Sequence, residues 1–117
     1  MKVLIAGDWH SELHENVVAT ALKNLGHEVE EFRWCRYFER PQGFWGRFVH
    51  WAKRAQNKYI TGSTVNRLNR DLVGVACHFR PDMLFVYRGT HITAKTLRAI
   101  KVASPASILV GYNNDDP

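Results

Sequence analysis

The chain has 117 residues, of which 45% are hydrophobic and 23% charged, which is ordinary for one globular domain. It contains no run of about 18 apolar residues and no secretion signal, which excludes a membrane-spanning helix and leads us to expect a cytoplasmic protein. The net charge of +5 is uneven, because residues 33–70 hold nine Lys/Arg and one acid, Glu39, which gives +8 there and −3 elsewhere.

The first third of the sequence predicts a β-α-β unit. Residues 2–6 (KVLIA) form an apolar run ended by Gly7, which is typical of a strand buried on both faces. Apolar residues recur at helical spacing over Glu12–Leu25, and Gly26 follows as a stop signal. A second strand is expected over Glu28–Trp34. Such a unit opens a Rossmann-type fold.

The rest of the chain continues the alternation of helices and strands. We therefore predict an α/β fold, with a Rossmann-like open parallel sheet of about four strands in the order 2-1-3-4 and helices on both faces. A doubly wound sheet would need one more helix after its last strand, so we expect a fragment of a longer protein. The remaining elements are helices over Pro41–Tyr59 and Thr64–Phe79, a strand over Met83–Tyr87, a helix capped by Thr93 and running to Ala103, and a strand over Ser107–Val110.

Polar loops follow three of the predicted strands. In an open parallel sheet the ligand crevice lies beyond the carboxyl ends of the strands, at the point where the strand order reverses. We therefore expect these loops to converge on a ligand. The candidate residues are Gly7, Asp8, Trp9 and His10 in the first loop, Arg88, Gly89, Thr90 and His91 in the second, and Asn113, Asn114 and Asp115 in the third.

Several of these residues admit two interpretations. His10 is a candidate base oriented by Asp8, or a loop histidine bonded to backbone. His10 and His14 have a spacing that suits a metal ion. The alternative for this region is a solvated helix start, at which Glu12 and Glu15 favour the helix dipole. No metal is expected, since no HExxH pattern is present.

The second and third loops leave further alternatives. Arg88 either binds a phosphate or carboxylate or pairs with Asp115 or Asp116. The two aspartates resemble a metal-binding pair, or they form a turn before Pro117. Because Gly7 belongs to no GxGxxG or Walker motif, the sequence argues against a dinucleotide or P-loop enzyme, and no cofactor is expected.

Three stretches carry a family resemblance: KVLIAGDWHSELHENVVATALKNLGHEV, RPDMLFVYRGTHITAKTLRAIK and ILVGYNNDDP. They resemble the N-terminal domain of GT-B glycosyltransferases, closest to the group related to the spore-maturation CgeB proteins and to other family 1 or family 4-like transferases. The resemblance implies two facing Rossmann domains, of which the first binds the acceptor and the second the nucleotide-sugar donor. It makes His10 and His91 candidate bases by position. Because the donor domain is absent, we expect this chain alone to be inactive.

The basic, aromatic middle of the chain suggests a second function. Arg47, Arg54 and Lys58 flank an aromatic helix face and could bind an anionic membrane surface, which would place the protein peripherally at the inner membrane face. Alternatively, the aromatic residues simply cover the sheet. No nucleic acid is expected, because no recognition motif is present. Cys35 and Cys77 are expected to be reduced packing residues.

Overall fold

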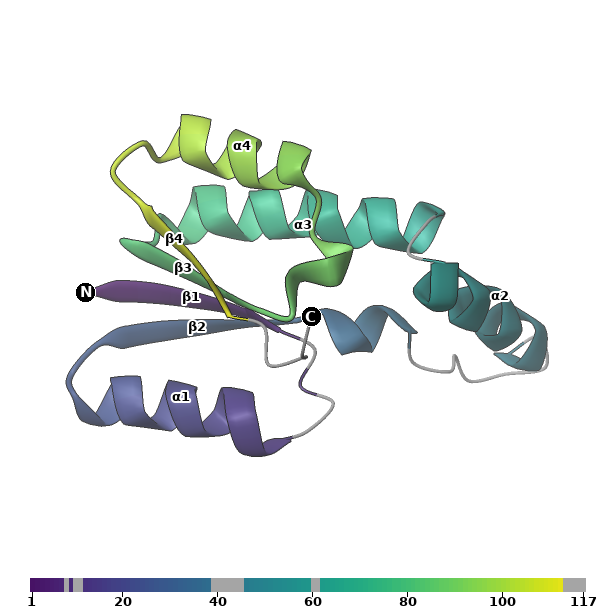
Figure 1. Ribbon diagram of the computed structural model, residues 1–117, viewed down its shortest axis with the longest axis horizontal. Helices are drawn as coiled ribbons and strands as arrows, with labels where there is room; N and C mark the ends of the chain where they lie inside the picture. Colours follow the sequence, from purple (N-terminus) through teal and green to yellow (C-terminus); the bar gives the residue numbers. More distant parts are fainter. Residues whose placement is uncertain (8, 10–11, 39–45, 60–61, 113–117) are drawn as a thin grey trace.

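The protein is an α/β domain in which four parallel strands are flanked by helices (Figure 1). The computed structural model describes residues 1–7, 9, 12–38, 46–59 and 62–112. In chain order the elements are β1 (Lys2–Gly7), α1 (Glu12–Asn24), β2 (Glu28–Arg33), the 3-10 helix η1 (Trp34–Phe38), α2 (Gly46–Tyr59), α3 (Ser63–Phe79), β3 (Met83–Tyr87), the 3-10 helix η2 (Gly89–His91), α4 (Ala94–Ala103) and β4 (Ile108–Tyr112).

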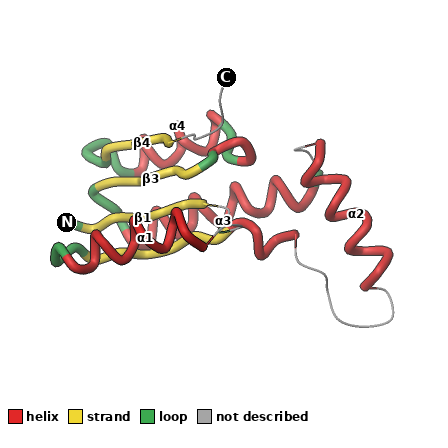
Figure 2. The backbone as a smooth tube through the Cα atoms, turned by 60° about the horizontal axis from the view of Figure 1, so that its bottom comes forward, coloured by secondary structure: helices red, strands yellow, loops and turns green. Residues whose placement is uncertain are grey.

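The strand order is β2-β1-β3-β4, and every neighbouring pair is parallel, which confirms the predicted Rossmann-like topology. In the register, Val3 of β1 lies opposite Val29 of β2 and Met83 of β3. Helix α1 covers one face of the sheet, and α3 and α4 cover the other (Figures 1 and 2). The chain therefore leaves β1 in one direction toward β2 and returns across it toward β3.

The central strand β1 is buried on both faces, as its apolar run predicts. Val3 and Ile5 belong to the core cluster on the α1 face, whereas Leu4 and Ala6 belong to the larger cluster under α3 and α4. All four side chains have 0% exposure. The alternation follows from the two-residue period of a strand.

Helical cover is thinner on the α1 face of the sheet. On the α1 face, β4 exposes Ile108 and Tyr112, and α1 itself exposes Val17, which the helical pattern places on its apolar stripe. The α1 face therefore has a smaller core cluster than the opposite face.

Helix α2 extends beyond the end of the sheet (Figure 1) and packs against α3 and η1. Trp51, expected on its apolar face, is 67% exposed. The interpretation that this face covers the sheet is therefore wrong for Trp51. Within the described ranges, no helix is long and apolar enough to cross a bilayer.

Some boundaries differ from the prediction. Trp34 begins η1 instead of ending β2, and β4 continues through Gly111 and Tyr112, beyond the expected end of the strand at Val110. Both cysteines are free thiols. Cys35 packs against the α1-face core as expected, but Cys77 is exposed, so its assignment as a packing residue is wrong.

Candidate functional site

The reversal of strand order places the candidate crevice between the carboxyl ends of β1 and β3. The two strands are hydrogen-bonded neighbours, yet the chain leaves them in opposite directions, toward β2 and toward β4. Side chains near Gly7 and Tyr87, the last residues of these strands, therefore border the crevice.

Glu15 packs directly against Gly7 at the end of β1. A Cβ on Gly7 would lie 2.9 Å from Glu15 Cγ and 3.1 Å from Glu15 Oε1, so only glycine fits here without displacement. The backbone N–H of Trp9 donates to Glu15 Oε1 at 3.2 Å. Helix α1 thus places the Glu15 carboxylate beside the last residue of β1.

The carboxylate of Glu15 is buried and only partly satisfied. The residue is 2% exposed, and its Oε2 has no hydrogen-bond partner among the described residues. Buried polar atoms are almost always bonded, and a carboxylate left without a partner loses considerable solvation free energy. The interpretation of Glu15 as part of a solvated helix start is therefore wrong. Its Oε2 atom is suited to accept a hydrogen bond from a ligand in this crevice.

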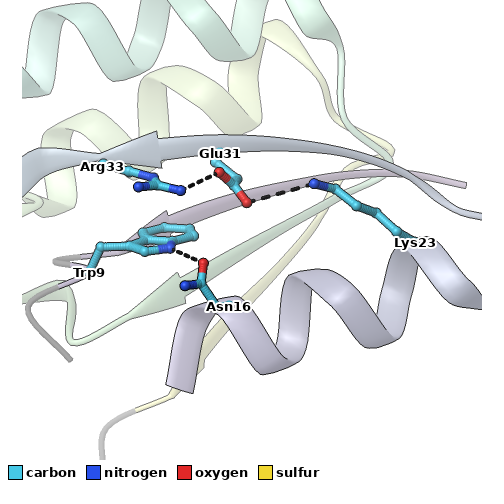
Figure 3. A network of polar contacts seen from close by, with 5 residues as sticks. All are labelled: Trp9, Asn16, Lys23, Glu31 and Arg33. Carbon is cyan, nitrogen blue, oxygen red and sulfur yellow. Dashed lines mark hydrogen bonds and ion pairs between the residues drawn. The ribbon is translucent and has the colours of Figure 1, made fainter. Parts of the chain in front are cut away.

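Trp9 connects the loop after β1 to both α1 and β2. Its φ of 56° is in the left-handed region, which is strained for a bulky residue. Its side chain is buried, the indole N–H donates to Asn16 Oδ1 at 2.8 Å, and the ring lies 5.1 Å from the guanidinium carbon of Arg33 (Figure 3). Glu31 pairs with Arg33 at 3.0 Å and with Lys23 at 3.8 Å.

Aromatic side chains form the wall of a cavity beside the crevice. The ring of Tyr87 stacks on His14 at a centroid distance of 5.7 Å and on Tyr112 at 5.2 Å. These rings, with apolar side chains of α1 and β3, line a cavity of about 430 Å³ on the α1 face. Concave apolar surfaces with a few polar groups are typical of small-molecule sites.

The loop after β3 has a fixed backbone. Arg88 has a φ of 56°, and its N–H donates to Tyr112 O at 2.9 Å. A Cβ on Gly89 would lie 2.7 Å from Val86 Cγ1, which explains the glycine. Thr90 Oγ1 lies 3.1 Å from His91 Nδ1.

His91 lies among core residues. It is 7% exposed, and its ring packs on Trp34 at 4.3 Å and on Phe38 at 5.5 Å. Trp34 belongs to the cluster on the α3 face, whereas Trp9, which bonds Glu15, belongs to the cluster on the α1 face. His91 and Glu15 are therefore associated with opposite faces of the sheet, and the base role of His91 stays a prediction.

Asn69, which was not predicted from the sequence, holds this loop in place. Its side-chain N–H groups donate to Val65 O and His91 O, and its Oδ1 accepts from Thr93 N and Thr96 Oγ1, all within 2.9 Å. An asparagine inside an amphipathic helix has no distinctive pattern, because three of its four partners lie more than 20 residues away in sequence.

Several predicted residues cannot be placed. Asp8, His10, Asn113, Asn114 and Asp115 lie outside the described residues, as does the alternative pairing of Arg88 with Asp115 or Asp116. Of the three residues of the predicted membrane surface, Arg54 is exposed. The side chains of Arg47 and Lys58 are not among those that the structure describes. Among the described residues, no three His, Cys, Asp or Glu side chains are grouped to hold a metal ion.

Comparisons with protein-family models, with curated proteins and with solved structures returned no match for this chain. The fold is thus shown by its own topology: a small α/β domain with a four-stranded parallel sheet.

Proposed function

We propose that this chain is the acceptor-binding domain of a GT-B type glycosyltransferase, with the acceptor hydroxyl bound in the crevice between β1 and β3. The observation that carries the proposal is the buried Glu15 Oε2, which has no partner among the described residues. Hydrogen bonds from a hydroxyl group to a carboxylate are among the stronger ones in proteins. The resemblance of three stretches of the sequence to GT-B N-terminal domains supports the same assignment.

The neighbouring aromatic wall favours a sugar-like acceptor. Tyr87, Tyr112 and His14 present stacked rings beside a cavity of about 430 Å³. A sugar has apolar C–H faces that pack on such rings and hydroxyl groups at its edge that need polar partners. Aromatic side chains next to a single carboxylate meet both requirements.

The chemistry of transfer gives Glu15 a role. An acceptor oxygen attacks the anomeric carbon of the donor sugar, the bond from that carbon to the phosphate oxygen breaks, and the acceptor proton goes to a base. For an acceptor in this crevice, Glu15 joins His10 as a candidate for that base, whereas His91 is associated with the opposite face of the sheet. The nucleotide-sugar donor would bind on a second domain.

Glu15 and Trp9 are both buried, and we infer that a ligand reaches the Glu15 carboxylate by a movement of Trp9. Trp9 binds the carboxylate through its N–H and adopts a strained backbone conformation. Strain of this kind, on the order of 1–3 kcal/mol, is concentrated at binding sites. We propose that acceptor binding displaces Trp9 and relieves this strain.

The test is an NMR titration of the ¹⁵N-labelled chain with a panel of mono- and disaccharides and, separately, with UDP-glucose. We expect saccharides to shift the amides of Gly7 and Trp9 and the Trp9 indole. Glu15→Gln replaces the charged acceptor by a neutral one and should weaken saccharide binding about fivefold. Glu28→Gln is the control, since it makes the same charge change at an exposed residue where β2 begins.

Absence of saccharide-induced shifts at these amides would contradict the proposal. Equal saccharide affinity of Glu15→Gln and the wild type would contradict it as well.

One observation favours peripheral membrane binding as a second candidate function. Trp51 is 67% exposed on α2, which extends beyond the sheet, and Arg54 is exposed three residues later. An exposed aromatic residue beside a cation is typical of interfacial helices. Reversing the charges of Arg47, Arg54 and Lys58 should abolish sedimentation with anionic vesicles, and unchanged sedimentation would exclude this function.

A further inference from the structure

A polar cavity, separate from the aromatic one, lies along the free edge of β2. It has a volume of about 350 Å³ and is formed where β2 passes into η1, beside the N-terminal half of α3. Its lining is rich in arginine. The lining residues are Glu31, Phe32, Arg33, Arg36, Tyr37 and Arg67.

Two of the three guanidinium groups are oriented by aromatic rings. Arg33 lies 5.1 Å from the centre of the Trp9 ring, and Arg67 lies 5.4 Å from the centre of the Tyr37 ring. A guanidinium that packs on a ring with its flat face keeps its N–H groups at the edge, where they can bind an anion. Arg33 is drawn with its pairing partner in Figure 3.

The charges of the lining are not balanced. Its three arginines face one acid, Glu31, which already pairs with Arg33 and with Lys23. Neither Arg36 nor Arg67 forms an ion pair with any residue in the described ranges. The cavity therefore has an excess of two positive charges.

Tyr37 adds no negative charge to this cavity. Burial, together with its hydrogen bond to Asp71 at 2.7 Å, raises the pKa of the Tyr37 phenol well above its usual value. The phenol is therefore neutral at physiological pH. Asp71 lies outside the lining, and its carboxylate accepts the Tyr37 hydrogen bond and approaches Arg70 at 3.6 Å.

We propose that Arg33, Arg36 and Arg67 form a binding site for a phosphate group. Planar guanidinium groups match phosphate oxygens in pairs of parallel hydrogen bonds, and an excess of two positive charges suits a phosphate monoester dianion. The site uses different side chains from the proposed acceptor crevice, although Trp9 contacts both, through its N–H at Glu15 and its ring at Arg33.

Calorimetric titration with inorganic phosphate at low ionic strength tests the site. Arg36→Ala and Arg67→Ala should each weaken phosphate binding about tenfold, the effect of losing one hydrogen bond between charged groups. Arg98→Ala, an exposed position on α4 at the other edge of the sheet, removes the same charge and should leave the affinity unchanged. Equal affinity of the wild type and both cavity variants would overturn the proposal.

Glu31→Gln gives a test of opposite sign. Removing the one acid of the lining should tighten phosphate binding about threefold for the monoanion and about tenfold for the dianion, the effect of one unit charge about 6 Å away in water. A variant that merely damages the fold would bind less. Equal or weaker binding by Glu31→Gln would therefore count against the site.

Two further ligands identify the source of the phosphate. Glycerol 3-phosphate represents a soluble phosphate ester, and phosphatidic acid vesicles represent a lipid headgroup, with phosphatidylcholine vesicles as the control. If the wild type binds one of these two ligands and the Arg36→Ala/Arg67→Ala double variant does not, that ligand represents the source of the phosphate. Binding of either ligand that survives the double variant would place the phosphate elsewhere and overturn the proposal.

Discussion

At the scale of single residues, Gly7 and Glu15 impose a tight steric constraint at the crevice. The Gly7 backbone is covered by the Glu15 side chain, whose carboxylate also accepts the Trp9 N–H. The sequence predicted Gly7 as a site residue from its place after an apolar strand. It could not identify Glu15, because a glutamate in the first turn of a helix is ordinarily solvated.

The substitution Gly7→Ala tests this contact. Its Cβ would lie 2.9 Å from Glu15 Cγ, so we expect a loss of about 1–3 kcal/mol in the free energy of unfolding, the usual effect of overpacking. Urea denaturation measures the change. Gly111→Ala is the control, because no atom lies within 4 Å of its Cβ, and it should change stability by less than about 0.5 kcal/mol. Equal effects of the two substitutions would refute the contact.

At the scale of elements, one buried side chain joins α3 to the start of α4. Asn69 is 7% exposed and bonds Thr93, the residue that caps α4 through a hydrogen bond from Thr96 N at 3.2 Å. The cap itself was predicted from the sequence and is confirmed. The link from Asn69 was not, since it depends on how two helices pack on one face of the sheet.

The substitution Asn69→Leu should destabilise this connection strongly. It keeps a similar volume but leaves the carbonyl of His91 and the N–H of Thr93 without their partner. We expect a loss of about 3 kcal/mol, measured by thermal or urea unfolding. Asn66→Leu on the exposed side of α3 is the matched control. If both variants unfolded at the same urea concentration, the hydrogen bonds of Asn69 would not contribute to the stability of the fold.

At the scale of the whole molecule, the sheet order 2-1-3-4 followed from the pattern of apolar runs and helical periods, because few topologies satisfy right-handed crossovers. The position of α2 did not follow. An amphipathic pattern indicates that a helix has an apolar side, but it does not identify the surface that receives it. The main contacts of helix α2 are with α3 and η1.

Backbone amide hydrogen exchange should differ between the elements according to how each one is packed. Strand β1 lies between two strands and under helices on both faces, so its amides should exchange slowest. Amides of α2 should exchange faster than those of α3, because α2 packs mainly on α3 and η1, whereas α3 packs on β1 and the larger core cluster. Exchange measured by mass spectrometry after brief labelling resolves the elements. Protection of α2 equal to that of α3 would show that α2 is held more firmly than its packing indicates.

Trp9 contacts both the acceptor crevice and the phosphate site, since its backbone N–H donates to Glu15 and its ring packs against the Arg33 guanidinium. A ligand that draws Trp9 away from the carboxylate also removes the ring from the guanidinium. Thermodynamic linkage then requires the two affinities to change by the same factor, whichever ligand arrives first. One indole would thus make two neighbouring sites cooperative or antagonistic without any rearrangement of the sheet.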